Sequence, residues 1–271
     1  ALICIFLFAN GIPAIGEIGF VKFITGDIWR PNNELFGIFP MIIGSLYVTA
    51  GAIIFGVPIG ILTSVFMAMC CPKQIYKPLK AATELLAGIP SVIYGFFGLV
   101  VVVPLIRSFG QTLKAAGLVQ NPGNGNSILT ASLILGMMIL PTIIGTTESA
   151  MRAVPSHYYE GSLALGATKE RSIFRVIIPA AKSGVIAGIV LGIGRAIGET
   201  MAVIMIVGNQ ARLTSSILDG IRTLTGNIVI EMGYATGLHR EALIATGVVL
   251  FVFILIINFS VALLKRGADH E

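Results

Sequence analysis

Six long apolar segments recur along this chain, and they constrain its fold more than any other feature. They are residues 1–16, 40–69, 83–106, 128–151, 183–208 and 242–264. Each is near the roughly 20 residues that an α-helix needs to cross the hydrocarbon core of a bilayer. We interpret the first as a span truncated at its N-terminal side. The pattern predicts an all-α, polytopic membrane protein whose six transmembrane helices form one domain over residues 1–271.

Charged residues are too scarce to cover a water-soluble domain of this length. Asp, Glu, Lys and Arg make up 11% of the 271 residues, against about 25% in ordinary soluble domains, and the mean hydropathy is +0.92. The formal net charge of +5 does not indicate nucleic-acid binding, because in membrane proteins the excess of Lys and Arg usually lies in cytoplasmic loops. Lipid is therefore the expected solvent for much of the surface.

The distribution of Lys and Arg predicts how the chain crosses the membrane. With the N-terminus inside, the segments 70–82 and 152–182 and the C-terminal tail are cytoplasmic and hold ten basic residues, against seven in the longer external loops. This excess favours an N-in, C-in topology. We expect the external segment 17–39, which contains Trp29, to lie along the membrane interface, where Trp is enriched. The external segment 209–240 is long enough to reach a partner outside the membrane.

The sequence carries no recognisable catalytic or metal-binding pattern. The three cysteines, Cys4, Cys70 and Cys71, lack the spacing of a metal site or a disulfide framework. The pattern G-x-x-x-x-G-K-[ST], which cradles nucleotide phosphates, does not occur. We therefore expect a chain that is not an enzyme and that binds no metal or cofactor of its own.

The cytoplasmic loop after the fourth segment contains a spaced pattern. It reads Glu160-Gly-Ser-Leu-Ala-Leu-Gly166, then nine residues, then Val176-Ile-Ile-Pro179. Gly166 can supply the left-handed residue that ends a short helix. Pro179 can end the cytoplasmic loop before the next span. Apolar Leu163 and Leu165 are suited to enter a groove on a partner. On these residues alone, an ordinary amphipathic cytoplasmic helix remains the alternative.

This pattern resembles the EAA loop of ABC importer permeases, in which a Glu, a Gly and a Pro stand at the same spacing. Gly and Ser replace the two alanines of that motif. The resemblance implies that the loop 152–182 forms short coupling helices that dock in a groove of an ATPase subunit. The residues implied in this coupling are Glu160, Gly161, Ser162, Leu163, Leu165, Gly166 and Pro179.

The fifth segment combines regularly spaced glycines with two charges. Gly184, Gly188 and Gly192 recur every four residues, the spacing that lets helix backbones approach closely in membranes. On a helix, Arg195 and Glu199 fall on the same face as these glycines, and as i, i+4 neighbours they are able to pair. The two charges are therefore expected to face packed protein or a cavity rather than lipid.

An arginine inside a membrane span implies a partner or a task. It costs about 2.5–3.5 kcal/mol at the centre of an inserted helix. Its planar guanidinium stays charged and donates two parallel hydrogen bonds, which suits an oxyanion. A purely structural ion pair with Glu199 is the alternative. Ser91, Tyr94 and Thr200 are further candidates that could add hydroxyl groups to a transport path, unless each hydroxyl is bonded within its own helix or to a neighbour.

Two runs resemble the PstC family of phosphate ABC transporter permeases, which have the MetI-like fold. Residues 192–203 read GIGRAIGETMAV and match the signature GxGRAxGETMAV. Residues 84–95 read ELLAGIPSVIYG and match ELLAxIPSxxYG. The resemblance extends over about residues 20–265. It implies that Arg195 and Glu199 act in phosphate transport, and we expect Glu199 to serve as the ion-pair partner and switch of Arg195.

The resemblance also implies an assembly in the inner membrane. The partners would be a PstA-like second permease, a PstB-like ATPase dimer that holds ATP and Mg²⁺, and a PstS-like phosphate-binding protein. The expected function is import of inorganic phosphate by alternating access through the permease heterodimer. A permease for sulfate, molybdate or phosphonate is one alternative, and a passive anion channel is another. Competition of phosphate uptake by these anions, and co-purification with an ATPase, would discriminate among them.

Overall fold

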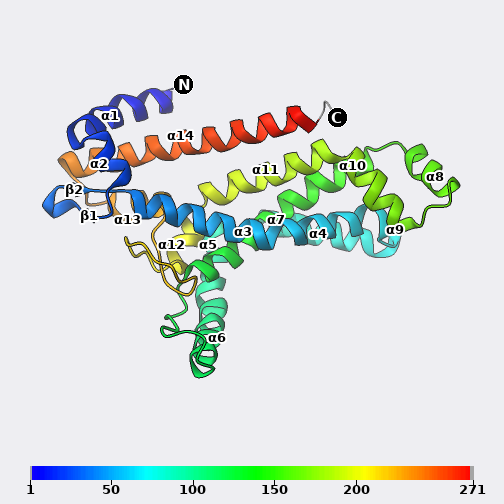
Figure 1. The fold of residues 1–271 in the computed structure, drawn as a ribbon, viewed down its shortest axis with the longest axis horizontal. Coiled ribbons are helices and arrows are strands. Elements are labelled where there is room, and N and C mark those ends of the chain that lie inside the picture. Colours follow the sequence, from blue (N-terminus) through cyan, green and yellow to red (C-terminus); the bar gives the residue numbers. More distant parts are fainter. Residues whose placement is uncertain (1, 269–271) are drawn as a thin grey trace. The chain divides into compact units, whose positions relative to one another are not determined.

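Helices dominate the computed structural model, which describes residues 2–268 and the side chains of residues 2–259 (Figure 1). The helices are α1 (Leu2–Ile18), α2 (Phe20–Thr25), α3 (Phe39–Val65), α4 (Lys73–Gly88), α5 (Ser91–Phe97), α6 (Val103–Ala115), α7 (Ile128–Arg152), α8 (Ser156–Ala164), α9 (Lys169–Ser172), α10 (Ile178–Ala180), α11 (Lys182–Gly198), α12 (Met201–Ile206), α13 (Leu224–Glu231) and α14 (Gly237–Ala268). The strands β1 (Trp29–Arg30) and β2 (Leu35–Phe36) pair antiparallel across the short 3₁₀ helix η1 (Pro31–Asn33). Three π-helical stretches, η2 (Phe66–Cys70), η3 (Gly98–Val102) and η4 (Ile173–Ile177), directly continue neighbouring α-helices.

Two of the predicted spans are not continuous helices. The segment 83–106 is interrupted where α4 ends at Gly88 and α5 begins at Ser91, because Pro90 lacks a backbone N–H and disfavours the helical conformation of the residue before it. The segment 183–208 is interrupted after Gly198, and α12 begins at Met201. Hydrophobicity alone does not reveal these breaks, since the side chains on both sides of each are mostly apolar.

Contacts group the chain into two compact units, and the first is built from three separate segments. They are the residues up to 51, 90–135 and 197–256. One buried cluster of this unit joins α1, the β1–β2 hairpin, α13 and the start of α14. Its members are Ala14, Phe23, Trp29, Phe36, Ile38, Met41, Leu224, Ala235, Ala242, Leu243 and Ala245. Segments more than 200 residues apart in sequence therefore share one core.

A buried carboxylate holds this first unit together. Glu231 accepts a hydrogen bond from Trp29 Nε1 at 2.8 Å and from an Arg222 nitrogen at 2.6 Å, and its second oxygen also lies 2.8 Å from His239 Nε2. A carboxylate out of water is tolerated because it is paired and hydrogen-bonded in this way. The side chain of Trp29 is buried within this unit, and the position of segment 17–39 along the membrane interface stays a prediction.

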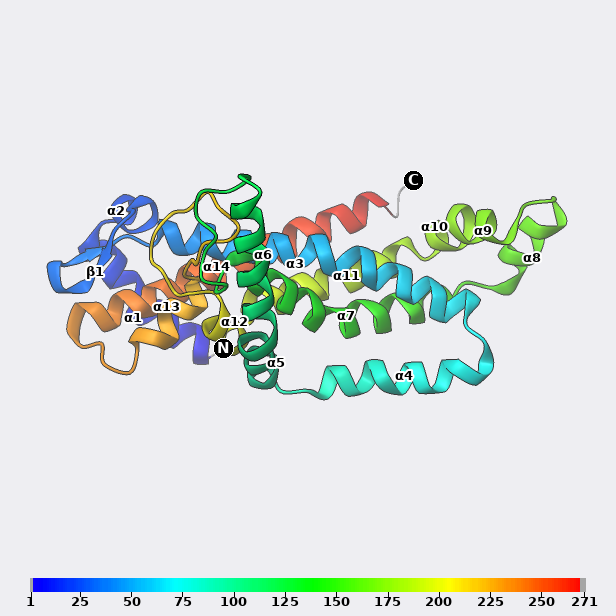
Figure 2. The same ribbon diagram turned by 90° about the horizontal axis from the view of Figure 1, so that it is seen from below.

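The second unit contains the segments 52–89 and 136–196 and the chain from residue 257. Val65, Met151 and Ile173 belong to its buried cluster, which joins the end of α3 and α7 to η4 and the start of α11. Within this unit α4 lies alongside the last turns of α7 (Figure 2). Residues of α3, α7, α11 and α14 belong to both units.

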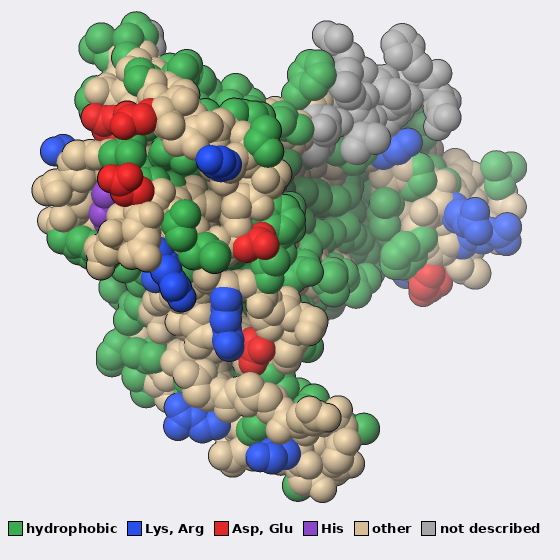
Figure 3. Space-filling model, turned by 60° about the vertical axis from the view of Figure 1, so that its left-hand side comes forward, with side chains coloured by type: hydrophobic (Ala, Val, Ile, Leu, Met, Phe, Trp, Pro, Cys, Tyr) green, Lys and Arg blue, Asp and Glu red, His purple; other side chains and the backbone are tan. Residues whose placement is uncertain are grey.

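Four stretches of helix are long and apolar enough to cross a membrane, by length and composition within the described residues. They are Phe39–Cys70, Ser91–Ala115, Ile128–Arg152 and Gly237–Phe259. The pair Lys169–Ala180 and Lys182–Gly198, bent by 73°, makes a fifth if it is counted as one span. Hydrophobic side chains cover much of the face seen in Figure 3, as expected for a surface in lipid or against another membrane subunit. The six-span, N-in, C-in topology stays a prediction.

Candidate functional site

The loop after α7 ends its short helix α8 in a defined cap. Leu165 follows the last helical residue, and Gly166 adopts the left-handed conformation with φ +85°. The N–H of Gly166 donates to the carbonyl of Leu163 at 2.9 Å, and the N–H of Ala167 donates to that of Ser162 at 3.2 Å. This pair of bonds is the Schellman motif. Gly166 therefore turns the chain sharply away at the end of α8.

The residue at the end of α8, Leu165, is apolar and exposed on the surface of the chain. Leu165 is 91% exposed, and α8 as a whole buries none of its residues. Leu163 is half-buried, whereas Glu160 and Gly161 are exposed. A leucine so fully exposed beside a fixed turn is the kind of surface that a partner groove covers. Pro179, the last residue of the spaced pattern, is exposed within α10.

Hydrogen bonds connect the two short helices of this loop. The hydroxyls of Ser162 in α8 and Ser172 in α9 lie 2.9 Å apart. Thr168 caps α9 by accepting from the N–H of Arg171 at 3.3 Å. Of the seven residues singled out for coupling, Ser162 is thus the one whose side chain holds the loop together. The two helices are positioned as one piece.

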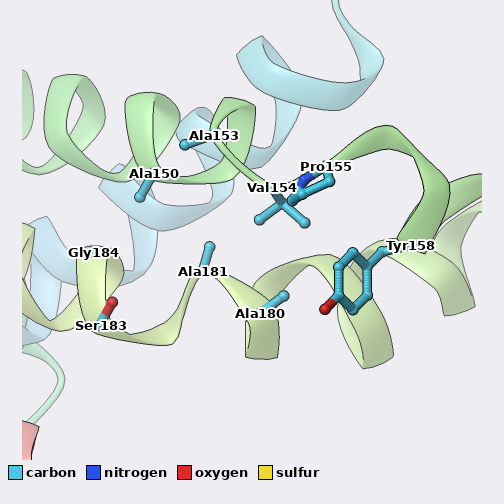
Figure 4. Close-up of a pocket in the computed structure, with 9 residues that line it drawn as sticks. All are labelled: Ala150, Ala153, Val154, Pro155, Tyr158, Ala180, Ala181, Ser183 and Gly184. Atoms are coloured by element: carbon cyan, nitrogen blue, oxygen red, sulfur yellow. The ribbon is translucent and has the colours of Figure 1, made fainter. Parts of the chain in front are cut away.

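A cavity of about 330 Å³ lies at the root of the same loop (Figure 4). The end of α7 and the start of α8 line one side, and α10 with the start of α11 lines the other, where the bend of 73° occurs. The lining residues are Ala150, Ala153, Val154, Pro155, Tyr158, Ala180, Ala181, Ser183 and Gly184. Because most of these side chains are small, the space between the two segments is left unfilled at this point.

The spaced glycines of α11 lie against α7. A Cβ atom at Gly184 would overlap the side chain of Ala150, one at Gly188 would lie 3.0 Å from Thr147 Oγ1, and one at Gly192 would lie 3.1 Å from an Ile143 carbon. Side chains at these positions would push the two helices apart. The glycines therefore set how closely α11 approaches α7 within the second unit.

Replacing Gly184 by alanine is expected to destabilise the protein by about 1–3 kcal/mol through overpacking. Gly194→Ala is the matched control, because it lies in the same helix with nothing within 4 Å of the added Cβ. Thermal unfolding of the purified protein in detergent measures the difference. Ala150→Gly should restore stability to Gly184→Ala. Equal midpoints for Gly184→Ala and Gly194→Ala would show that the close approach is not required.

The sequence predicts that Arg195 faces packed protein or a cavity on the same side of the helix as the spaced glycines. In the structure Arg195 lies three residues before the end of α11, and its side chain is exposed rather than packed with those glycines against α7. A cavity shared with another subunit stays a prediction. Within the described part of the chain, the structure gives it no ion pair with a carboxylate. The charge of the guanidinium is therefore not neutralised by a carboxylate among the described residues of this chain.

Glu199 is engaged with the start of the next helix. Its carboxylate accepts from the N–H of Thr200 at 3.1 Å and from the N–H of Ala202 at 3.3 Å. The first N–H groups of a helix have no partner within it, so this carboxylate caps α12. The hydroxyl of Thr200 donates to the carbonyl of Gly198 at 3.3 Å. The capping state differs from the predicted i, i+4 pair, because the helix that would have paired the two charges ends at Gly198.

Ser91 and Tyr94 lie in α5, which packs closely on α12. A Cβ atom at Gly95 would lie 2.9 Å from the Cα of Ala202. Tyr94 is buried and Ser91 is half-buried at the first residue of α5. Two of the predicted hydroxyl candidates therefore lie on an element that contacts the helix capped by Glu199.

One functional candidate was missed from the sequence. Glu148 is buried in α7 and pairs with Lys80 and Arg152 at 2.9 Å each. A carboxylate inside a predicted span, four residues before an arginine, was the available signal, since such pairs meet on one helix face. Lys80 is 68 residues from Glu148 in sequence, so no local pattern indicates that the two side chains pair.

Comparison with known proteins gives a consistent result. The family described as "binding-protein-dependent transport system inner membrane component" matches residues 56–270. The phosphate transport system permease protein PstC of Mesorhizobium japonicum is 37% identical over 265 residues, covering 94% of this chain and 81% of that protein. The PstC protein of Pasteurella multocida is 33% identical, covering 92% and 81%.

Solved structures of ABC transporters share the fold. A chain of the methionine transporter MetNI in an inward-facing conformation superposes with a TM-score of 0.63 at 20% identity, covering 89% of this chain and 99% of that one. A chain of the bacterial transporter that imports the acidic polysaccharide alginate gives 0.61 at 17% identity, covering 98% and 95%. At these identities the likeness concerns the fold alone.

Proposed function

The chain belongs to the family of binding-protein-dependent transport system inner membrane components, and from this membership we propose that it is the subunit of an ABC importer that carries inorganic phosphate across the inner membrane. The observation that carries the proposal is the exposed Arg195, free of any ion pair within the described residues, inside a run that matches phosphate permeases. The names of the relatives support the same substrate.

The proposed assembly divides binding and hydrolysis among subunits. This chain is non-catalytic and pairs with a homologous PstA-like permease, while a PstB-like ATPase dimer holds ATP and Mg²⁺. The exposed Leu165 and the fixed turn at Gly166 support docking of α8 on the ATPase. A PstS-like binding protein delivers phosphate from outside. ATP-driven closure of the ATPases moves the coupling loops and switches the permease pair between two states.

In the proposed path, Arg195 binds phosphate through two parallel charged hydrogen bonds. Glu199 alternates between two partners. While phosphate is bound, its carboxylate keeps its hydrogen bonds to the N–H groups of Thr200 and Ala202 at the start of α12. When the site is empty it neutralises Arg195. Glu199 thus competes with phosphate for Arg195 and favours the release of phosphate. Without this competitor, the Arg195 guanidinium would hold the phosphate dianion for longer.

The switch role of Glu199 is separable from its capping role by substitution. Glu199→Gln keeps an oxygen that accepts the two N–H groups but removes the charge. We expect it to lower the rate of phosphate uptake by about tenfold, the size of one lost charge-assisted interaction. Uptake by proteoliposomes measures the rate, and Glu241→Gln, an exposed carboxylate, is the control. If Glu199→Gln transports normally and only Glu199→Ala is impaired, the carboxylate serves α12 alone.

The proposed function is tested by ATP-dependent uptake of labelled phosphate into proteoliposomes that contain the complete complex. Unlabelled phosphate should compete fully, and sulfate, molybdate and phosphonate should not. Competition by one of those anions instead would reassign the substrate while keeping the importer class. Uptake without ATP would contradict an ATP-driven importer and indicate a passive channel.

A further inference from the structure

A buried carboxylate in the second unit is joined to three side chains. Glu148 of α7 has a side chain that is 2% exposed. It accepts hydrogen bonds from the Tyr76 hydroxyl at 2.6 Å, from Lys80 Nζ at 2.9 Å and from Arg152 Nε at 2.9 Å. Tyr76 and Lys80 belong to α4, and Arg152 is the last residue of α7. These four residues are called the Glu148 cluster below.

The cluster also reaches the end of α3. A second nitrogen of Arg152 donates to the carbonyl of Met67, in η2, at 2.9 Å. The Arg152 guanidinium lies over the ring of Tyr76, 4.4 Å from its centroid, where the negative face of the ring attracts a cation. One carboxylate and one guanidinium thus connect α4, the end of α7 and the segment that follows α3.

The helix α4 buries little of its own surface. None of its residues is buried. Tyr76, Leu79, Lys80 and Thr83 are its half-buried positions, and they form a single narrow stripe at helical spacing. Polar contacts with Glu148 therefore make up a large part of what holds α4 against α7.

The cluster lies, along the chain, between the two functional segments already described. Arg152 precedes the first residue of α8, the helix of the coupling loop, by four positions. At its other end α4 leads through Ile89 and Pro90 into α5, which carries Ser91 and Tyr94. A displacement of α8 reaches α7 first, and the Glu148 cluster is the connection through which it reaches α4.

We propose that the Glu148 cluster is a positioning device that couples movement of α8 to α4, and through the Pro90 break to α5. This inference rests on the proposed function, since it assigns the cluster a role in ATP-driven transport. Separating α4 from α7 would take away two of the three partners of a buried carboxylate, Tyr76 and Lys80, which is unfavourable. The two helices therefore move together instead of sliding apart.

The charge state of the cluster suits a permanent connection. The hydrogen bond to Glu148 raises the pKa of Lys80 above its ordinary value, so the amine stays charged at physiological pH. The same carboxylate raises the pKa of Tyr76, so its hydroxyl stays protonated and keeps donating. Neither group is therefore expected to change its protonation near neutral pH.

The test compares two lysines of the same helix. Lys80→Gln removes one partner of Glu148, whereas Lys77→Gln changes an exposed lysine one turn earlier that faces away from the cluster. Complete complexes in proteoliposomes are assayed for phosphate imported and ATP hydrolysed. We expect Lys80→Gln to raise the ATP hydrolysed per imported phosphate by about threefold or more, with Lys77→Gln unchanged. Tyr76→Phe, which removes a single oxygen, should change the ratio in the same direction.

The ratio of ATP to phosphate separates transmission from mere stability. A destabilised complex loses hydrolysis and import together, so its ratio stays constant. A constant ratio in both Lys80→Gln and Tyr76→Phe would therefore overturn the positioning role, whether or not the total activity falls. If the unaltered complex imported no phosphate, the proposed function and this inference would both be wrong.

Discussion

Replacing Arg195 by alanine is expected to lower phosphate uptake by at least about 100-fold, because two charge-assisted hydrogen bonds are lost, each contributing about 1.5–3 kcal/mol. Arg195→Lys should recover only part of the rate, since an ammonium is a point charge without the planar fork of the guanidinium. The measurement is the initial rate of ATP-dependent uptake by the reconstituted complex, at equal amounts of permease in the membrane.

Arg212→Ala is the matched control for this prediction. Arg212 is an exposed arginine in the predicted external loop and should be replaceable without loss of uptake. Near-normal uptake by Arg195→Ala, with normal assembly, would remove Arg195 from the phosphate path. In that case membership of the permease family would stand, and the substrate site would have to lie elsewhere in the chain or on its partner.

Replacing Leu165 by aspartate is expected to weaken attachment of the ATPase by at least about 100-fold. Burial of a leucine side chain contributes about 1.5–3 kcal/mol, and an unpaired carboxylate placed in an apolar groove adds a further cost. The fold of this chain should not change, because Leu165 is 91% exposed. Co-purification of the ATPase with the tagged permease, and ATP-dependent uptake, measure the effect.

Leu118→Asp provides the control for Leu165→Asp. Leu118 is also an exposed leucine, at 72%, and lies in a predicted external loop, where no ATPase binds. It should retain both the ATPase and uptake. Full retention of the ATPase by Leu165→Asp would show that α8 does not bury Leu165 in a partner, and the coupling role would pass to other residues of the loop.

Features with a local signal were predictable from the sequence. Three glycines at a spacing of four anticipate a close helix contact, and α11 lies on α7 at all three positions. A glycine after a short amphipathic run anticipates a left-handed cap, and Gly166 has φ +85°. In both cases the physical cause acts within one helix or one turn, so neighbouring residues suffice to predict it.

Features that depend on tertiary contacts were not predictable. Trp29 is buried and donates a hydrogen bond to Glu231, 202 residues later, a contact that no local sequence pattern indicates. The Glu148 cluster joins α7 to α4, and its members Tyr76 and Lys80 are 72 and 68 residues from Glu148 in sequence. Helix α11 ends at Gly198, and the Glu199 carboxylate therefore caps the following helix instead of pairing with Arg195. The spacing of apolar residues does not indicate which distant polar residues pair or where a helix ends within an apolar segment.

The three π-helical stretches have a consequence for how this architecture varies. A π-turn closes its hydrogen-bonded ring with one more residue than an α-turn. Helix continues on both sides of η3 and η4, so each of these holds surplus backbone inside a longer helical stretch, whereas η2 ends its helical stretch at Cys70. The buried face of the helix before such a stretch stays aligned with the buried face after it, although one residue has been added between them. Single-residue insertions and deletions can therefore be tolerated within the helices of this fold, and not only in the loops that join them.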